Sequence, residues 1–119
     1  MQNQKSALGL DANVTALIGY PIGIVALILV FIEKDNKFVR FHAFQSLLFW
    51  AVATVLWIGL IFLMIFLAFI SSILATLFWL LLMVVGLGVF AGIIFLAYKA
   101  FQGEMFKLPI IGDMAEKWS

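Results

Sequence analysis

The sequence contains no cysteine, which excludes disulfide bonds, thiolate catalysis and metal sites built on sulfur. Charged residues are also scarce, at 11% of the chain, against about 25% in an average soluble domain. Hydrophobic residues make up 66% of the 119 residues, and a soluble chain of this length could not cover so much apolar surface. The net charge of +1 offers no basic surface, so we expect no nucleic-acid partner. The composition therefore suits a lipid bilayer.

The first long apolar stretch covers residues 14–32 and follows a polar N-terminal segment, residues 1–13. It is too long for the apolar region of a signal peptide and ends in charged residues rather than small ones. Its length in a helix matches a hydrocarbon core about 30 Å thick, which needs about 20 residues. Pro21 lies inside it and is expected to kink the helix. We therefore expect a retained, kinked transmembrane helix.

No Asp, Glu, Lys or Arg occurs between Phe41 and Tyr98. This run is too long for one span, and the two hydroxyl residues Ser71 and Ser72 are its best break. The break predicts two further spans, at about residues 43–70 and 73–98. The sequence thus predicts an all-α integral membrane bundle of three transmembrane helices, within a transmembrane domain of residues 14–99. Four shorter spans are the alternative.

Positive charge predicts the orientation of the spans. With three spans, the basic loop of residues 33–40 and the tail of residues 100–119 lie on one side, together with Lys99. These segments carry all but one of the seven Lys and Arg residues, and only Lys5 lies opposite. With four spans, Lys5 would join the tail and the charges would divide almost evenly. The positive-inside rule therefore favours three spans in the inner (plasma) membrane, with the loop and the C-terminus cytoplasmic and the N-terminus outside.

The tail is expected to form a short helix of its own. Gly103 can end the third span in a left-handed conformation. Beyond it, one helical face is apolar, with Asp113, Glu116 and Lys117 on the opposite face. The pattern predicts a helix lying in the cytoplasmic interface, and a frayed tail is the alternative because such short helices depend on packing. The apolar face comprises Ile110, Ile111, Met114, Ala115 and Trp118.

The start of the second span carries polar residues with a possible binding role. His42 and Gln45 are three residues apart and share one helical face. Together with Arg40 and with Lys99 they could hold a lipid headgroup phosphate or the backbone of a partner protein. The simpler interpretation is an interfacial anchor, in which Arg40 extends to the surface and the other side chains still reach water.

Small residues form two faces suited to helix packing. Gly19 and Gly23 lie on one face of the first span, and Gly88 and Gly92 form a second pair in the third span. Small residues allow membrane helices to approach closely. In a three-span topology the two pairs lie at different depths, so each needs another partner. That partner is either the second helix, which is the simpler interpretation, or a neighbouring protein.

No arrangement of residues indicates catalysis. Glu33, Asp35 and His42 are poor candidates for a metal site, because the chain has one histidine and its carboxylates lie on a loop. No hydroxyl is placed with a histidine and a carboxylate, and no glycine-rich phosphate loop is present. We therefore expect no enzymatic activity, no cofactor and no metal.

Two segments resemble a known family of small prokaryotic membrane proteins, most of them uncharacterised. They are residues 38–47, FVRFHAFQSL, and residues 100–113, AFQGEMFKLPIIGD. That family is similar, at a distance, to the twenty-kilodalton Tic subunit of the chloroplast protein import translocon. The resemblance extends over nearly the whole chain from Leu10. It implies an all-helical inner-membrane protein with a part in protein transport or in the assembly of membrane complexes.

Three functions remain open. A non-enzymatic accessory or assembly subunit of a membrane protein complex is favoured, because the small-residue faces lack an internal match. A Tic-like translocation or channel component is the second; it would have to be an oligomer, since three helices without a polar face cannot enclose a water-filled path. A lipid-binding membrane protein is the third. The expected partners are the bilayer and either other membrane proteins or further copies of the chain.

Overall fold

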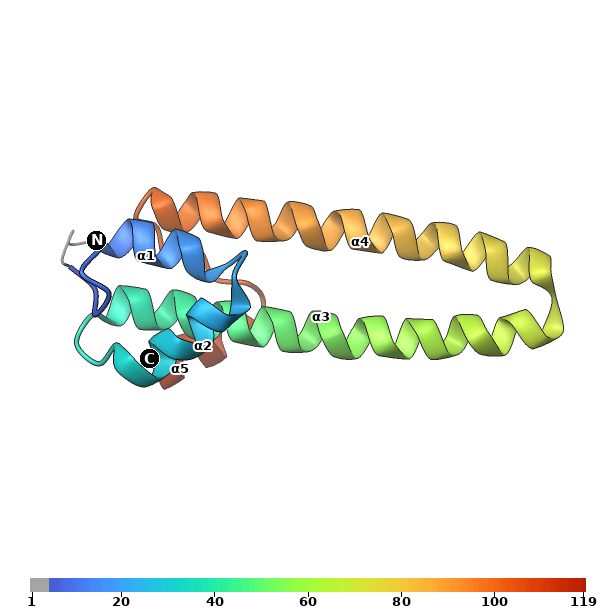
Figure 1. Ribbon diagram of the computed structural model, residues 1–119, viewed down its shortest axis with the longest axis horizontal. Coiled ribbons are helices and arrows are strands. Elements are labelled where there is room, and N and C mark those ends of the chain that lie inside the picture. Colours follow the sequence, from blue (N-terminus) through green and yellow to red (C-terminus); the bar gives the residue numbers. More distant parts are fainter. Residues whose placement is uncertain (1–4) are drawn as a thin grey trace. The chain divides into compact units, whose positions relative to one another are not determined.

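The computed structural model describes residues 5–119, and within that range every regular element is a helix. The elements are α1 (Ala12–Gly19), α2 (Gly23–Ile32), α3 (Lys37–Ile70), α4 (Ser72–Phe101) and α5 (Ile111–Trp118) (Figure 1). The expected all-α class is confirmed. The chain divides into two compact units. The first unit is Met1–Trp50 with Ile93–Ser119, and the second unit is Ala51–Gly92.

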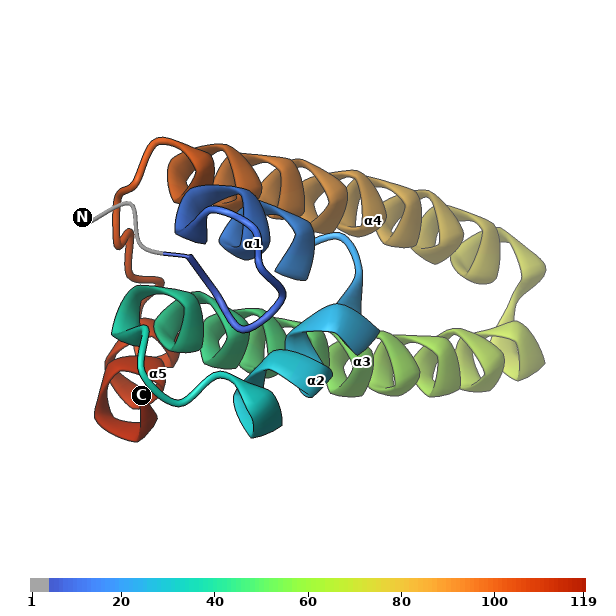
Figure 2. The ribbon, with the colours of Figure 1, turned by 60° about the vertical axis from the view of Figure 1, so that its left-hand side comes forward.

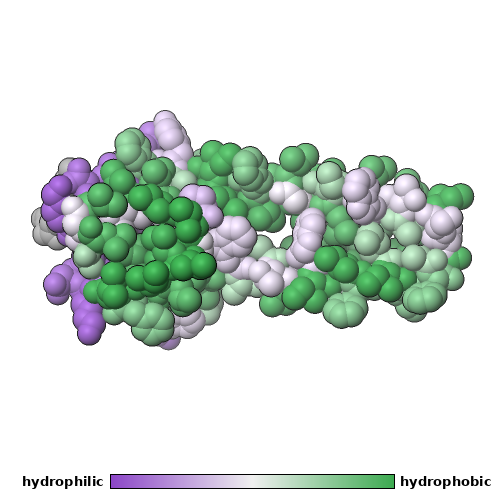
Figure 3. All heavy atoms as spheres, in the orientation of Figure 1, coloured by the Kyte–Doolittle hydropathy of each residue, from purple (hydrophilic) through white to green (hydrophobic). Residues whose placement is uncertain are grey.

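The second unit is the apolar part of α3 and α4. Ser71 alone separates the two helices, and its hydroxyl accepts a hydrogen bond from the Leu74 amide at 3.5 Å. The predicted break in the long apolar run is therefore confirmed at this position. Inside the unit Trp57 lies against Gly86, where an added Cβ would be 3.4 Å from the indole. Most of the visible face of these helices is apolar (Figure 3).

Two helices of the described residues, α3 and α4, are long and apolar enough to cross a membrane. α2 is apolar as well, but it has only 10 residues, about 15 Å of helix. The expected number of three spanning helices is therefore not reproduced, and neither are four. α4 ends as predicted, because Gly103 has a φ of 82° and the Glu104 amide bonds the Lys99 carbonyl at 3.1 Å.

The expected first span, residues 14–32, is two short helices instead of one. α1 ends at Gly19, the chain bends through Pro21, and α2 starts at Gly23. The two helices fold back on each other (Figures 1 and 2), with an added Cβ at Gly19 only 3.8 Å from the Cβ of Ala26. A kink was expected at the proline, but a reversal of the chain was not.

The reversal brings the two ends of this helical pair together. The backbone amide of Ala7 donates a hydrogen bond to the carboxylate of Glu33. Two groups in direct contact cannot lie on opposite sides of a hydrocarbon layer about 30 Å thick. The structure therefore does not reproduce the expected separation of the N-terminal segment from the loop of residues 33–40, for the chain from Lys5 onward.

A buried polar network as the candidate functional site

The bend between α1 and α2 is held by two side chains of α3. The Ser46 hydroxyl donates to the Gly19 carbonyl at 2.7 Å, and the Trp50 indole donates to the Tyr20 carbonyl at 2.9 Å. These two carbonyls lie at the end of α1, which stops at Gly19, so they have no partner within the helix. Irregular backbone is tolerated at membrane depth only where protein groups satisfy it. These two bonds meet that condition.

Behind the bend, three polar side chains form one continuous chain of hydrogen bonds. Gln45 Nε2 donates to the Tyr20 hydroxyl at 2.8 Å, and that hydroxyl is bonded in turn to His42 Nδ1. His42 Nε2 lies 2.9 Å from the carbonyl oxygen of Glu104. A carbonyl can only accept, so the partners assign the proton to Nε2 and leave Nδ1 as the acceptor for Tyr20. All three side chains are almost completely buried.

Gln45 also fixes the segment that follows α4. Its amide nitrogen donates to the Phe106 carbonyl at 2.8 Å, and its amide oxygen accepts from the Leu108 amide at 2.9 Å. With the bond to Tyr20, both amide hydrogens and the oxygen of Gln45 have partners. The network thus joins α1, α3 and the segment leading to α5. Since a buried polar group without a partner is costly, its complete pairing favours one arrangement.

Arg40 closes the C-terminal end of α2. Its Nη1 donates to the carbonyls of Val30, at 3.2 Å, and of Glu33. A cation is favourable there because the last carbonyls of a helix lack partners within it. Arg40 Nε also bonds the Ser119 carbonyl at 3.3 Å, and the guanidinium stacks 5.3 Å above the Phe44 ring. These contacts connect Arg40 on α3 to the end of α2 and to the C-terminal residue.

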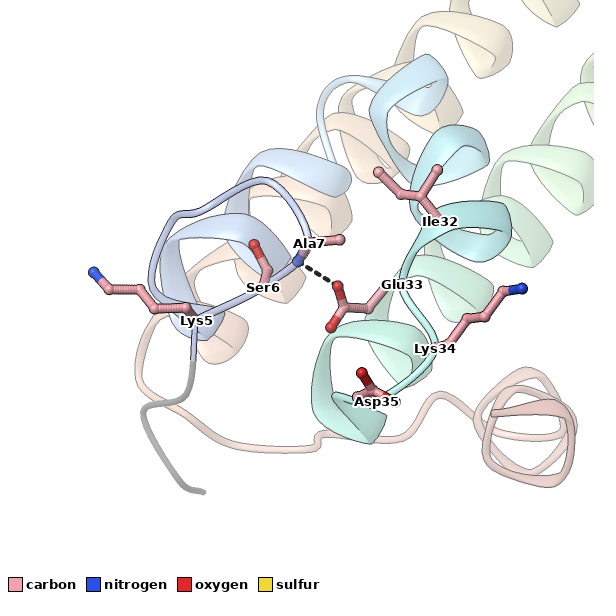
Figure 4. A pocket seen from close by; sticks show the side chains of 7 residues that line it. All are labelled: Lys5, Ser6, Ala7, Ile32, Glu33, Lys34 and Asp35. Atoms are coloured by element: carbon pink, nitrogen blue, oxygen red, sulfur yellow. Dashed lines mark hydrogen bonds between the residues drawn. The ribbon is translucent and has the colours of Figure 1, made fainter.

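Glu33 is a structural residue that the sequence analysis did not identify. It was considered only as a weak metal-ligand candidate on an exposed loop, yet its relative exposure is 3%. Its carboxylate accepts from the backbone amides of Ala7 and Asn36, and Figure 4 shows it aimed at the N-terminal segment while Lys5 and Lys34 point away. In the sequence, Glu33 stands out only as an acidic residue directly after an apolar run. Its structural role could not be inferred from that position, because it depends on the chain reversal at Pro21, which brings the Ala7 amide to the carboxylate.

A pocket of about 360 Å³ lies between the N-terminal segment and the start of the loop (Figure 4). Glu33 is the most buried of its charged residues, and both carboxylate oxygens already accept hydrogen bonds from backbone amides. The described residues contain no group of three or more His, Asp or Glu side chains that could hold a metal ion. The pocket is lined by Lys5, Ser6, Ala7, Ile32, Glu33, Lys34 and Asp35.

The predicted interaction residues thus have different environments. His42 and Gln45 lie together inside the network, at relative exposures of 1% and 0%, so neither faces a lipid headgroup. Arg40 is partly exposed but caps α2. Lys99 pairs with the carboxylate of Glu104 at 3.1 Å, and the backbone carbonyl of Glu104 contacts His42. Headgroup binding by Arg40 or Lys99 stays a prediction.

The predicted packing glycines divide in the same way. Gly19 packs against α2, and an added Cβ at Gly23 would lie 3.7 Å from the Trp50 indole. Both contacts lie inside the chain, but only that of Gly23 is with the expected second span, so the choice between the two interpretations stays a prediction. Gly88 is exposed, and a Cβ added there would have no atom within 4 Å. Gly92, one turn further on, is half-buried.

α5 forms where an amphipathic helix was expected. The residues of α5 that are buried against the rest of the chain are its small ones. Gly112 and Ala115 are buried, and Trp118 meets the Phe44 ring edge-on at 6.1 Å between centroids. Lys107 pairs with Glu116 at 2.7 Å on the exposed side. The hydrogen bond to Glu116 raises the pKa of Lys107, because it stabilises the charged amine.

Two helices of spanning length with largely exposed apolar surfaces fit a helical membrane protein by length and composition. The chain belongs to the magnetosome magnetite crystal formation protein family, whose model matches residues 3–115. It is similar to a UPF0132 membrane protein of Methanocaldococcus jannaschii, with 44% identity over 116 residues, covering 97% of this chain and 94% of that protein. A UPF0132 membrane protein of Archaeoglobus fulgidus is 38% identical over 106 residues, covering 88% and 92%. No solved structure matches the chain.

These similarities confirm part of the resemblance inferred from the sequence. The relatives are small membrane proteins of the uncharacterised UPF0132 family, as expected. Neither the family model nor these relatives supports the similarity to the Tic subunit or a part in protein transport.

Proposed function

We propose that this chain is a non-enzymatic accessory subunit of a membrane assembly, and that it associates with neighbouring membrane proteins through the exposed face of α4. One observation carries the proposal: Gly88 is exposed and has open space where a side chain would lie. At Gly86, two residues earlier, the space beside the backbone is occupied by the indole ring of Trp57 from the same chain. An exposed small residue on a membrane helix permits close approach of another helix.

The family description agrees with this proposal in one respect. It concerns the formation of magnetite crystals in magnetosomes, a process to which an accessory membrane subunit could contribute. The proposal requires neither catalysis nor a bound metal, and it assigns the buried network a structural role. Tyr20, His42 and Gln45 fix the fold that presents α3 and α4.

The topology that goes with this function has two crossings, both by long helices. α1 and α2 enter the membrane from the cytoplasmic side and return to it. All seven Lys and Arg residues then lie on the cytoplasmic side, which satisfies the positive-inside rule better than three spans do. The contact between Ala7 and Glu33 and the capped bend at Pro21 support this arrangement.

The association is tested by replacing the exposed glycine. Gly88→Leu should reduce the oligomeric or co-purifying fraction at least fivefold in native mass spectrometry from a mild detergent. Gly59→Leu is the matched control, because Gly59 is also exposed, with open space, but lies on α3. Its association should stay within twofold of the wild type. A strictly monomeric wild type without any co-purifying protein would overturn the proposal.

A further inference from the structure

The imidazole of His42, the single histidine of the chain, connects two segments that are far apart in sequence. Its Nδ1 accepts from the hydroxyl of Tyr20, and its Nε2 donates to the carbonyl of Glu104. The rings of Phe38 and Phe41 meet the imidazole edge-on, at 4.6 and 5.0 Å between centroids. With 1% relative exposure the imidazole is closed off from water, and each of its two nitrogens has a protein partner.

Around this imidazole, each hydrogen of the polar network has its own acceptor. The hydrogens are the two on the Gln45 amide, the one on the Tyr20 hydroxyl and the one on His42 Nε2. Their acceptors are the Tyr20 oxygen, the Phe106 carbonyl, His42 Nδ1 and the Glu104 carbonyl. A second proton on the imidazole removes the acceptor Nδ1 and adds a donor in its place. The hydroxyl hydrogen of Tyr20 is then left without an acceptor among these groups.

A charge on the imidazole would also lack a counter-ion. Within residues 5–119, α1 faces the ring with the neutral hydroxyl of Tyr20, and α2 has no titratable side chain. After α4, Glu104 offers its backbone carbonyl to the ring, while its carboxylate pairs with Lys99 at 3.1 Å. The other charged groups of these segments are cations, Arg40 on α3 and the exposed Lys107. A buried charge without a counter-ion is costly, so a second proton opposes the closed network.

The segment that follows α4 is the part of the network that depends on the neutral imidazole. The bend at Tyr20 has separate bonds from Ser46 and Trp50, and neither of these side chains titrates near neutral pH. Residues 104–110 bond to α3 through His42 and Gln45. Loss of the histidine contact therefore weakens the hold on this segment more than the hold on the bend.

Release of the segment would bring the imidazole into water, where a histidine becomes protonated as the pH falls through about 6.5. The released state then binds more protons than the closed state, so lowering the pH favours release. We propose that protonation of His42 releases residues 104–110 from α3, so that the network is a pH-sensitive switch. The switch is closed at neutral pH and opens in acid. This inference does not depend on the proposed subunit role.

The test follows the imidazole and the segment separately, in the whole chain in detergent. Because the chain has one histidine, NMR of ¹⁵N-labelled histidine reports this ring alone. At neutral pH Nε2 should carry the hydrogen, and at about pH 4.5 the imidazolium should appear. Over the same range the Leu108 amide, which donates to Gln45, should lose at least tenfold of its protection from hydrogen exchange. Protection is taken relative to an unstructured amide at the same pH, and the Met64 amide of the second unit should keep its protection.

Two variants complete the experiment. His42→Gln is matched to the wild type, because its side-chain amide can donate and accept but does not titrate. It should protect Leu108 equally at both pH values. Glu104→Gln removes the carboxylate beside Lys99 and keeps the carbonyl that His42 bonds, so it should respond to acid as the wild type does.

Four results would overturn the proposal. The first two need only the wild type, so they do not depend on how a variant folds: an imidazolium that forms while Leu108 stays protected, or a ring that remains neutral at about pH 4.5. The third is an equal loss of protection at Met64, which indicates general unfolding in acid. The fourth is an acid response that persists in His42→Gln or disappears in Glu104→Gln, since the response would then belong to another group.

Discussion

The indole nitrogen of Trp50 lies 2.9 Å from the carbonyl oxygen of Tyr20, and it donates a hydrogen bond to that oxygen where the chain leaves α1. Ser46, one helical turn earlier on α3, does the same for Gly19. α3 therefore supplies the two donors that the bend before Pro21 requires. Four experiments follow from this arrangement and from the contacts around it.

Removing the indole donor should loosen the bend. Trp50→Phe keeps an aromatic ring against Gly23 but leaves the Tyr20 carbonyl without its partner. The expected loss of unfolding free energy is about 0.5–2 kcal/mol, measured by denaturant titration in detergent. Trp79→Phe is the control, since that half-exposed indole lies on α4, and it should leave stability nearly unchanged. An equal effect of both changes would contradict the capping role.

Replacing Gln45 should release the segment before α5. Gln45→Leu removes the partners of the Phe106 carbonyl and the Leu108 amide together. We expect a loss of about 2–4 kcal/mol, because buried groups are left unpaired. Hydrogen exchange should accelerate at the Leu108 amide at least tenfold. Gln102→Leu, which removes an exposed amide bonded to Tyr98, should not change exchange at Leu108.

The folded-back pair makes a direct prediction about topology. The chain has no cysteine, so single cysteines can be labelled without background in intact cells. Lys5→Cys, Lys34→Cys and Lys117→Cys should all be protected from an impermeant reagent, and Ser72→Cys should be labelled from outside. Labelling at Lys5 together with Ser72 would restore the three-span topology and contradict the reversal at Pro21.

The docking of α5 depends on a position that tolerates no side chain. A Cβ added at Gly112 would lie 2.5 Å from the Cβ and 2.7 Å from the Cα of Lys107, and backbone cannot move aside cheaply. Gly112→Ala should therefore cost about 1–3 kcal/mol and weaken the contact of Trp118 with Phe44, which tryptophan fluorescence can follow. Gly59→Ala has open space and should stabilise α3 by up to about 1 kcal/mol. The opposite signs distinguish a clash from a general effect of alanine.

Features encoded by neighbouring residues were predicted correctly from the sequence. The break at Ser71 follows from two hydroxyl residues in an apolar run, and the end of α4 follows from Gly103. The amphipathic pattern near the C-terminus likewise predicted α5. Each of these signals is local, so spacing and residue type are sufficient.

The fold of residues 14–32 was predicted wrongly because its cause is not local. The hydropathy and length of residues 14–32 predict a spanning helix, and Pro21 by itself predicts only a kink in that helix. The reversal depends on Ser46 and Trp50, which lie 27 and 30 residues beyond the carbonyls they satisfy. The same holds for His42 and Gln45: their shared face was recognised, but their partners at Glu104 and Phe106 come from the other end of the chain.

The single residue between α3 and α4 has a consequence for how the chain enters a membrane. Ser71 carries no charge, and neither does any residue from Phe41 to Tyr98. Moving this turn through the hydrocarbon layer therefore requires the dehydration of little more than two serine hydroxyls and the helix ends beside them. In the proposed two-crossing topology, the charged groups do not have to cross the hydrocarbon layer. Insertion of the helical hairpin can precede the pairing of Tyr20, His42 and Gln45, so the cost of burying them falls on folding rather than on translocation.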